Sequence, residues 1–306
     1  MMRKLLLLLL IMFPFFCYAQ ERGNSIKSTM TSNHQPDKKV AILMVHFGTT
    51  YDDTRAVTID AINAKVKQSF PEMEIREAYT SRIIMRRLKT RGILKQTPFE
   101  ALLKLRSEGY THVLVQSTDI IDGNEMESLR RDVASVASFF NDIRVGCPLL
   151  YSVEDDEAVV KIMTDHAKDI KGDIVWIGHG THGPATAIYT LLDYMLKANK
   201  KDRFHVGTIE GYPTFDTMLA QLKARKAKVV TLVPFMFVAG NHANNDISVD
   251  WKQALEKAGF KVNVMMEGLG QIPEIQDMFI GHLKYIMNNK PLDIMEKKAQ
   301  YANETE

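Results

Sequence analysis

Cysteine is scarce in this sequence, and two other signals are missing: an excess of one charge sign and an apolar run long enough to span a membrane. The 306 residues contain 2 cysteines, Cys17 and Cys147, so a network of disulfide bonds cannot stabilise the fold. Lys and Arg number 39 and Asp and Glu 37, a near balance that argues against a nucleic-acid-binding protein. The longest apolar run, residues 5–16, is too short to span a bilayer as a helix. With 45% hydrophobic residues, the chain is instead typical of a globular protein stabilised by its core.

The first 19 residues are typical of a secretory signal peptide. Arg3 and Lys4 precede the apolar run, and Cys17-Tyr-Ala19 before Gln20 fits a cleavage site. We therefore expect cleavage after Ala19 and release into the periplasm. The alternative is that Cys17 becomes a lipid-modified first residue that tethers the protein to a membrane. In either case Cys147 remains without a partner for an internal disulfide, and we interpret it as a buried, unreactive thiol.

Beyond the N-terminus, short apolar runs alternate with segments of helical periodicity, which is typical of an α/β fold. The runs predict eight strands, over residues 40–45, 73–78, 112–116, 143–147, 174–177, 205–209, 229–233 and 261–265. Helices are predicted between them, including one over 53–70 and one over 98–107 with Thr97 as its N-cap. The order of elements in the first half is repeated in the second, and Gly123–Glu125 aligns with Gly240–His242.

These patterns predict two doubly wound parallel-sheet halves, flavodoxin-like in arrangement, that face each other across a central cleft. The proposed segments are a signal peptide (1–19), a flexible tether (20–37), an N-terminal half (38–165), a C-terminal half (166–290) and a polar tail (291–306). His166 and His282 are expected on helix surfaces, and His112 and His205 within strands.

Three metal-binding side chains each follow a strand of the predicted second half. His179 lies among glycines after residues 174–177, Glu210 ends the next strand, and His242 follows the third after an apolar segment. The carboxyl ends of parallel strands meet at one edge of a sheet, so we expect the three side chains to converge there. Two imidazoles and one carboxylate are typical ligands of a divalent first-row metal.

The residues from about 39 to 287 resemble the anaerobic-type sirohydrochlorin cobaltochelatases, a family of class II tetrapyrrole chelatases. The resemblance depends on five motifs, at residues 46–55, 80–82, 178–182, 207–211 and 239–246. It implies two flavodoxin-like halves with a tetrapyrrole in the cleft. It also implies that His179, Glu210 and His242 are the metal-binding and catalytic residues. The sequence departs from the family pattern at His46, where Ser is usual, and at Asp119, where His is frequent.

The same resemblance suggests which residues bind the tetrapyrrole, whose ring carries eight carboxylates. Arginine binds carboxylates through two parallel hydrogen bonds. We expect Arg55 and Arg82 in this role, and interpret the other cations of residues 82–91, including Arg86 and Arg87, as a solvated helix face. The remaining candidates on the cleft wall are His46, Glu125 and His182.

The expected activity is insertion of a divalent metal, Co²⁺ or else Fe²⁺ or Ni²⁺, into a sirohydrochlorin-like tetrapyrrole. Two alternatives follow from the expected export, because synthesis of such rings is normally cytoplasmic. The protein could be a periplasmic carrier of haem, tetrapyrrole or metal, or an enzyme that removes metal from a scavenged ring. The sequence leaves open whether the chain forms a homo-oligomer and whether it binds haem.

Overall fold

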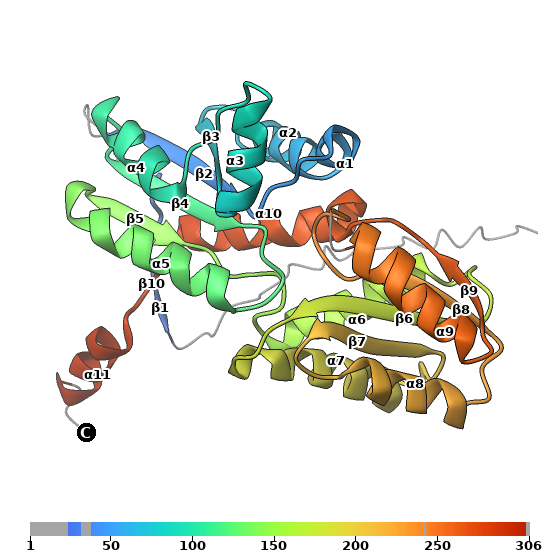
Figure 1. Cartoon of the computed structure of the whole chain (residues 1–306). Coiled ribbons are helices and arrows are strands. Elements are labelled where there is room, and N and C mark those ends of the chain that lie inside the picture. The colour runs from blue at the N-terminus through green and yellow to red at the C-terminus, as the bar shows by residue number, and fades with distance from the viewer. Residues whose placement is uncertain (1–23, 32–37, 241–242, 304–306) are drawn as a thin grey trace, which may run out of the picture.

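The computed structural model describes residues 24–31, 38–240 and 243–303, which form two α/β halves with a small accessory sheet (Figure 1). The expected signal peptide, Cys17 and the candidate ligand His242 lie outside these residues. Within the described ranges, no helix is both long enough and apolar enough to cross a membrane.

A four-stranded parallel sheet forms the first half. Its order is β3-β2-β4-β5, with β2 (Val40–His46), β3 (Glu74–Tyr79), β4 (His112–Ser117) and β5 (Asp142–Val145). Strand β2 pairs with β3 on one side and β4 on the other, so Val45 lies between Ala78 and Ser117. The chain therefore reverses its direction across the sheet between β2 and β4. Ligands of such sheets bind beyond the carboxyl ends of the strands at this point.

The second half has the same topology. Its order is β7-β6-β8-β9, with β6 (Asp173–Gly180), β7 (Phe204–Glu210), β8 (Val229–Pro234) and β9 (Lys261–Val264). All eight predicted strands are present, and the predicted fold class is confirmed. Strand β6 continues to Gly180, so His179 belongs to the end of the strand and not to the loop after it.

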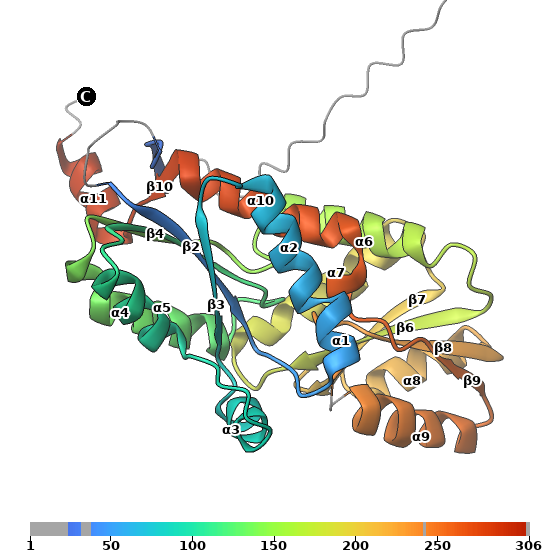
Figure 2. The same cartoon turned by 90° about the horizontal axis from the view of Figure 1, so that it is seen from above.

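Helices cover both faces of each sheet (Figure 2). The first half contains α1 (Asp52–Val57), α2 (Ile59–Ser69), α3 (Arg82–Thr90), α4 (Pro98–Ser107) and α5 (Asn124–Val136). The later helices are α6 (Val153–His166), α7 (Ala187–Ala198), α8 (Phe215–Ala224), a π-helix (Ala243–Trp251), α9 (Lys252–Lys257), α10 (Pro273–Asn288) and α11 (Ile294–Asn303).

Two helix predictions had different outcomes. Thr97 caps α4 as predicted, because its Oγ1 accepts from the Glu100 amide at 3.2 Å and the Glu100 carboxylate accepts from the Thr97 amide at 2.8 Å. The single helix predicted over residues 53–70 is wrong, because Thr58 interrupts it with φ −121° and ψ −78°. The chain there forms α1 and α2, and both precede the second strand of the sheet.

The strands are buried on both faces, which explains their continuous apolar runs. In β2, Ile42 and Met44 belong to one core cluster, whereas Leu43 packs into a second cluster with helices α4 and α5. In β6, Trp176 joins the same cluster as Ile42, and Ile177 joins a third cluster on the outer face of the second sheet. The two halves therefore share one central core, which holds the site between them in place.

The C-terminal helix α10 crosses from the second half back to the first (Figure 1). It contacts β4, β5, α2 and α6, and Lys65 of α2 binds Asp277 of α10 at 2.7 Å. The simple division into residues 38–165 and 166–290 is therefore incomplete. His282 of α10 was expected on a helix surface, and this prediction is wrong: the side chain is 1% exposed, because its face of the helix is covered by the first half.

Part of the segment predicted to be a flexible tether is ordered. Residues of β1 (Ser25–Lys27) pair antiparallel with β10 (Asn289–Pro291), and Met30 is buried in the central core. Arg144 of β5 reinforces this contact, since its Nη1 donates to the carbonyl of Ser28 at 2.6 Å. Main-chain pairing needs no apolar pattern, which is why the polar sequence concealed it. The predicted polar tail, residues 291–306, likewise contains α11 and the last residue of β10.

Candidate functional site

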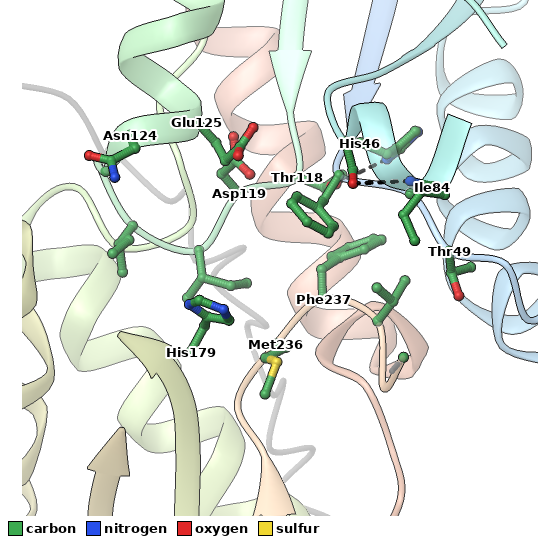
Figure 3. Close-up of a pocket in the computed structure, with 18 of the residues that line it drawn as sticks. His46, Thr49, Ile84, Thr118, Asp119, Asn124, Glu125, His179, Met236 and Phe237 are labelled. Carbon is green, nitrogen blue, oxygen red and sulfur yellow. Dashed lines mark hydrogen bonds between the residues drawn. The ribbon is translucent and has the colours of Figure 1, made fainter. Parts of the chain in front are cut away.

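A cavity of about 580 Å³ lies between the two halves, beyond the carboxyl ends of both sheets (Figure 3). This volume is typical of a small-molecule site. The first half contributes, among others, His46, Thr49, Ile84, Arg87, Asp119 and Glu125. The second half contributes residues at or after the ends of β6, β7 and β8, among them His179, Thr181, His182, Glu210, Met236 and Phe237. The structure thus contains the predicted cleft, and both halves line it.

Glu210 and His179 come from paired strands at one wall of this cavity. Gly180, which follows His179, lies opposite Glu210 in the β6–β7 ladder. Gly180 has a φ of +80°, and a Cβ built there would lie 1.5 Å from the Glu210 carbonyl oxygen. Only glycine allows the two strand ends to approach this closely. The structure therefore brings two of the three predicted metal ligands to the same wall.

The hydrogen bonding of His179 suits metal binding. Its Nδ1 lies 3.1 Å from the Gly180 carbonyl oxygen. A ring nitrogen that donates to a carbonyl carries the proton, which places the lone pair of the neutral ring on Nε2. His182 Nε2 lies 3.7 Å from Glu210 Oε2, but the His182 side chain is 86% exposed. Such an exposed pair is weak, so a metal ion can replace His182 as the partner of Glu210.

The third predicted ligand, His242, falls outside the described residues. Gly240, two positions earlier, does line the cavity. Among the residues whose placement is described, no group of three or more His, Cys, Asp or Glu side chains is arranged to hold a metal ion. The three-ligand site with His242 therefore stays a prediction.

His46 lines the opposite wall and is held by neighbouring side chains. Its Nδ1 lies 3.0 Å from Thr118 Oγ1 and its Nε2 lies 3.1 Å from Asn63 Oδ1. Phe237 of the second half stacks on the ring at 6.2 Å between centroids. Burial lowers the pKa of His46 to about 4, so the ring is neutral near pH 7. With both nitrogens hydrogen-bonded, His46 forms cavity wall and a contact between the halves, and does not direct a lone pair into the cavity.

The structure places Arg55 and Arg82, the two arginines expected to bind tetrapyrrole carboxylates, away from the cavity lining. Arg55 donates through Nε to Asp60 at 2.9 Å, and its Nη2 lies 3.3 Å from both carboxylate oxygens of Glu77. Arg82 is exposed at the start of α3, where its charge acts on Glu100 and Asp132. Both guanidinium groups therefore interact with carboxylates of the protein itself.

Arg87 lines the cavity, although the charge pattern of residues 82–91 predicted a solvated helix face there. Ile83 and Ile84 line the cavity as well, and Arg87 follows them by four and three positions. Residues at this spacing share one face of a helix. That spacing, apolar at two positions and cationic at the third, is the signal that could have identified Arg87 from the sequence.

Asp119 and Glu125 also line the first-half wall, and their carboxyl groups lie near each other in Figure 3. Burial raises the pKa of Asp119 to about 7, an effect that the charge of Glu125 increases. A hydrogen bond of 2.6 Å from Ser117 Oγ to the Asp119 carboxylate acts in the other direction. The Asp119 carboxyl can therefore exchange a proton near neutral pH.

Two α/β halves of one topology, with histidine and glutamate on the wall of the cavity between them, define the architecture of a tetrapyrrole chelatase. Residues 40–288 match the family model described as cobalt chelatase (CbiK). The chain belongs to this family. The resemblance inferred from the five sequence motifs is confirmed.

Two relatives with assigned activities are similar over nearly their whole length. The sirohydrochlorin cobaltochelatase of Salmonella typhimurium is 36% identical over 257 residues, covering 82% of this chain and 97% of the relative. The sirohydrochlorin cobaltochelatase CbiKC of Nitratidesulfovibrio vulgaris is 31% identical over 271 residues, covering 86% of this chain and 95% of the relative.

Solved structures support the fold. SirB from Bacillus subtilis with Fe³⁺ superposes with a TM-score of 0.58 at 16% identity, and the match covers 82% of this chain and 96% of that one. The sirohydrochlorin chelatase SirB from Bacillus subtilis subspecies spizizenii, in complex with cobalt, gives 0.54 at 19% identity, with 82% and 95% covered. Both proteins therefore share the two-half architecture described above.

Proposed function

We propose that this protein inserts Co²⁺ into sirohydrochlorin or a closely similar tetrapyrrole. The observation that carries the proposal is the placement of His179 and Glu210 on adjacent strand ends at the wall of the interdomain cavity. The family and the two named relatives supply the reaction and the substrate class. Fe²⁺ and Ni²⁺ remain alternative metals, because imidazole and carboxylate bind all three ions.

The protein must assist two steps of the proposed reaction. The metal must exchange its water for ring nitrogens, which His179 and Glu210 assist by holding the ion with coordination positions left open. Two pyrrole protons must also leave the ring as the metal–nitrogen bonds form. Asp119, on the first-half wall and with a pKa raised to about 7, is suited to accept one of them, and the other can pass to solvent water. The ring would lie between these two walls.

An absorbance assay tests the reaction. Purified protein that begins at Gln20 is mixed with sirohydrochlorin and Co²⁺ without oxygen, and the spectrum of the metallated ring is followed. We expect an initial rate that rises linearly with protein concentration above the rate of spontaneous insertion. A rate that does not depend on protein would refute the activity. Parallel reactions with Fe²⁺ and Ni²⁺ would identify the preferred metal.

We also propose that the chain is cleaved after Ala19 and acts in the periplasm. The support is the sequence of residues 1–19, with its basic start, apolar run and cleavage site. Mass spectrometry of the protein expressed from its full sequence should find Gln20 as the first residue in a periplasmic extract. A diacylglycerol-modified Cys17 in the membrane fraction would show that the chain is lipid-anchored instead.

A further inference from the structure

Most of the charged side chains that line the cavity are acidic. Its lining includes three carboxylic acids, Asp119, Glu125 and Glu210, and among the described residues Arg87 is the one Lys or Arg that lines it. Arg87 belongs to α3, which projects from the first sheet (Figure 2) and contributes Ile83, Ile84 and Arg87 to the cavity lining. A ligand that carries many carboxylates is repelled by these acids and attracted to the cation of Arg87.

The cationic group of Arg87 also differs from most other arginines of the first half. Arg55, Arg76 and Arg130 each form an ion pair with at least one carboxylate, at 2.5–3.3 Å. At Arg87 the backbone carbonyl accepts a hydrogen bond from the Thr90 hydroxyl at 2.7 Å. Within the described part of the chain, no ion pair to its guanidinium is present, and the side chain is exposed.

The apolar neighbours of Arg87 complete a surface suited to the edge of a macrocycle. Ile84 is buried at the cavity wall, and Ile83 is 58% exposed although it also lines the cavity. An exposed isoleucine beside an arginine offers contact both to an apolar ring and to its charged substituent. This combination occurs at the wall that carries neither His179 nor Glu210.

We propose that Arg87 binds a peripheral carboxylate of the tetrapyrrole and so determines which edge of the ring faces α3. The inference rests on the proposed function and adds a specificity residue to it. A guanidinium group forms two parallel hydrogen bonds with a carboxylate, and this geometry fixes direction as well as contributing affinity. The ring is then oriented with its centre toward the wall of His179 and Glu210.

The test compares Arg87→Gln with Arg86→Gln. Arg86 is the neighbouring exposed residue of α3 and does not line the cavity, so it is a control for charge alone. We expect Arg87→Gln to raise KM for sirohydrochlorin about 10-fold, the loss typical of one charge-assisted hydrogen bond, with kcat changed less than about twofold. Arg86→Gln should leave KM within about twofold, and Arg87→Lys should recover part of the affinity because it keeps the charge.

A binding measurement separates this inference from the proposed function. Quenching of ring fluorescence gives the Kd of an octacarboxylate porphyrin and of its fully esterified form, with no need for turnover. We expect Arg87→Gln to weaken binding of the acid about 10-fold and of the ester hardly at all. Equal Kd values for wild type, Arg86→Gln and Arg87→Gln would overturn the role of Arg87, whether or not cobalt is inserted. If Arg87→Gln weakens binding of the acid as expected but the wild-type protein inserts no cobalt, only the proposed reaction is refuted.

Discussion

Replacing His179 by Ala should lower the rate of cobalt insertion at least about 100-fold, and Glu210→Gln should have a comparable effect. Both side chains belong to one wall of the cavity, where Gly180 pairs with Glu210. Loss of a residue that only supports a ligand typically costs about 10–100-fold in metal affinity or activity, so loss of a ligand itself should cost more. The assay is the initial rate of insertion at saturating tetrapyrrole, with Co²⁺ affinity measured separately.

Two controls make this prediction specific. His182→Ala removes the exposed imidazole 3.7 Å from Glu210, and we expect at most about a 10-fold loss, because this exposed pair is weak. Circular dichroism and thermal unfolding should be unchanged in both ligand variants, since neither side chain is part of the core. If His179→Ala and Glu210→Gln both insert cobalt at the wild-type rate, the metal binds elsewhere. Asp119 and Glu125 on the opposite wall would then be the next candidate ligands.

Replacing His282 by Ala should destabilise the fold by about 3–5 kcal/mol. His282 Nε2 lies 3.1 Å from Asp155 Oδ1, and the two side chains are 1% and 0% exposed. Removal of the imidazole leaves a buried carboxylate without its cationic partner, which is the costly way to break such a pair. The pair joins α10 to the start of α6, so its loss should loosen the connection between the halves. Urea unfolding at pH 7 measures the effect.

His166→Ala is the matched control for this variant. His166 forms a similar contact with Glu267 at 2.9 Å, but its side chain is 32% exposed. Exposed pairs contribute about 0–1 kcal/mol, so the control should change stability by no more than this. Equal destabilisation by the two substitutions would contradict the account of the buried pair.

The contribution of His282 should also depend on pH in one direction. Burial alone would lower its pKa, but Cys147 and the Asp155 carboxylate raise it to about 10, above the ordinary value of 6.5. The folded state therefore holds the proton more tightly than the unfolded state, so the stabilisation is complete below pH 6.5 and disappears as pH rises through 10. Burial also raises the pKa of Asp156 to about 7. Asp156 titrates in both the wild type and His282→Ala. The difference between their free energies of unfolding at each pH therefore reports the effect of the His282 substitution.

The sequence was sufficient to predict the eight strands because each is a short apolar run between turn residues. The same runs placed His179 and Glu210 at strand ends, and parallel pairing then brought them to one wall. The positions of the strands and of the residues at their ends depend on the apolar pattern of the neighbouring sequence.

Contacts between distant segments could not be predicted in this way. The pairing of β1 with β10 joins residues near opposite ends of the chain, and the burial of His282 depends on the return of α10 to the first half. Arg55 shows the same limit, since motif position favoured it as a tetrapyrrole ligand whereas Glu77 and Asp60 bind it in the folded chain. Side-chain partners from other elements decide which cation reaches the cavity.

The number of rings metallated per protein molecule tests the central claim most directly. With sirohydrochlorin and Co²⁺ each in 100-fold excess over protein, and spontaneous insertion subtracted, a chelatase should metallate many rings per chain until one substrate is exhausted. A carrier of tetrapyrrole or metal would instead stop at about one equivalent per chain, and an enzyme that removes metal would show no net insertion. Either of these last two results would contradict the proposed function.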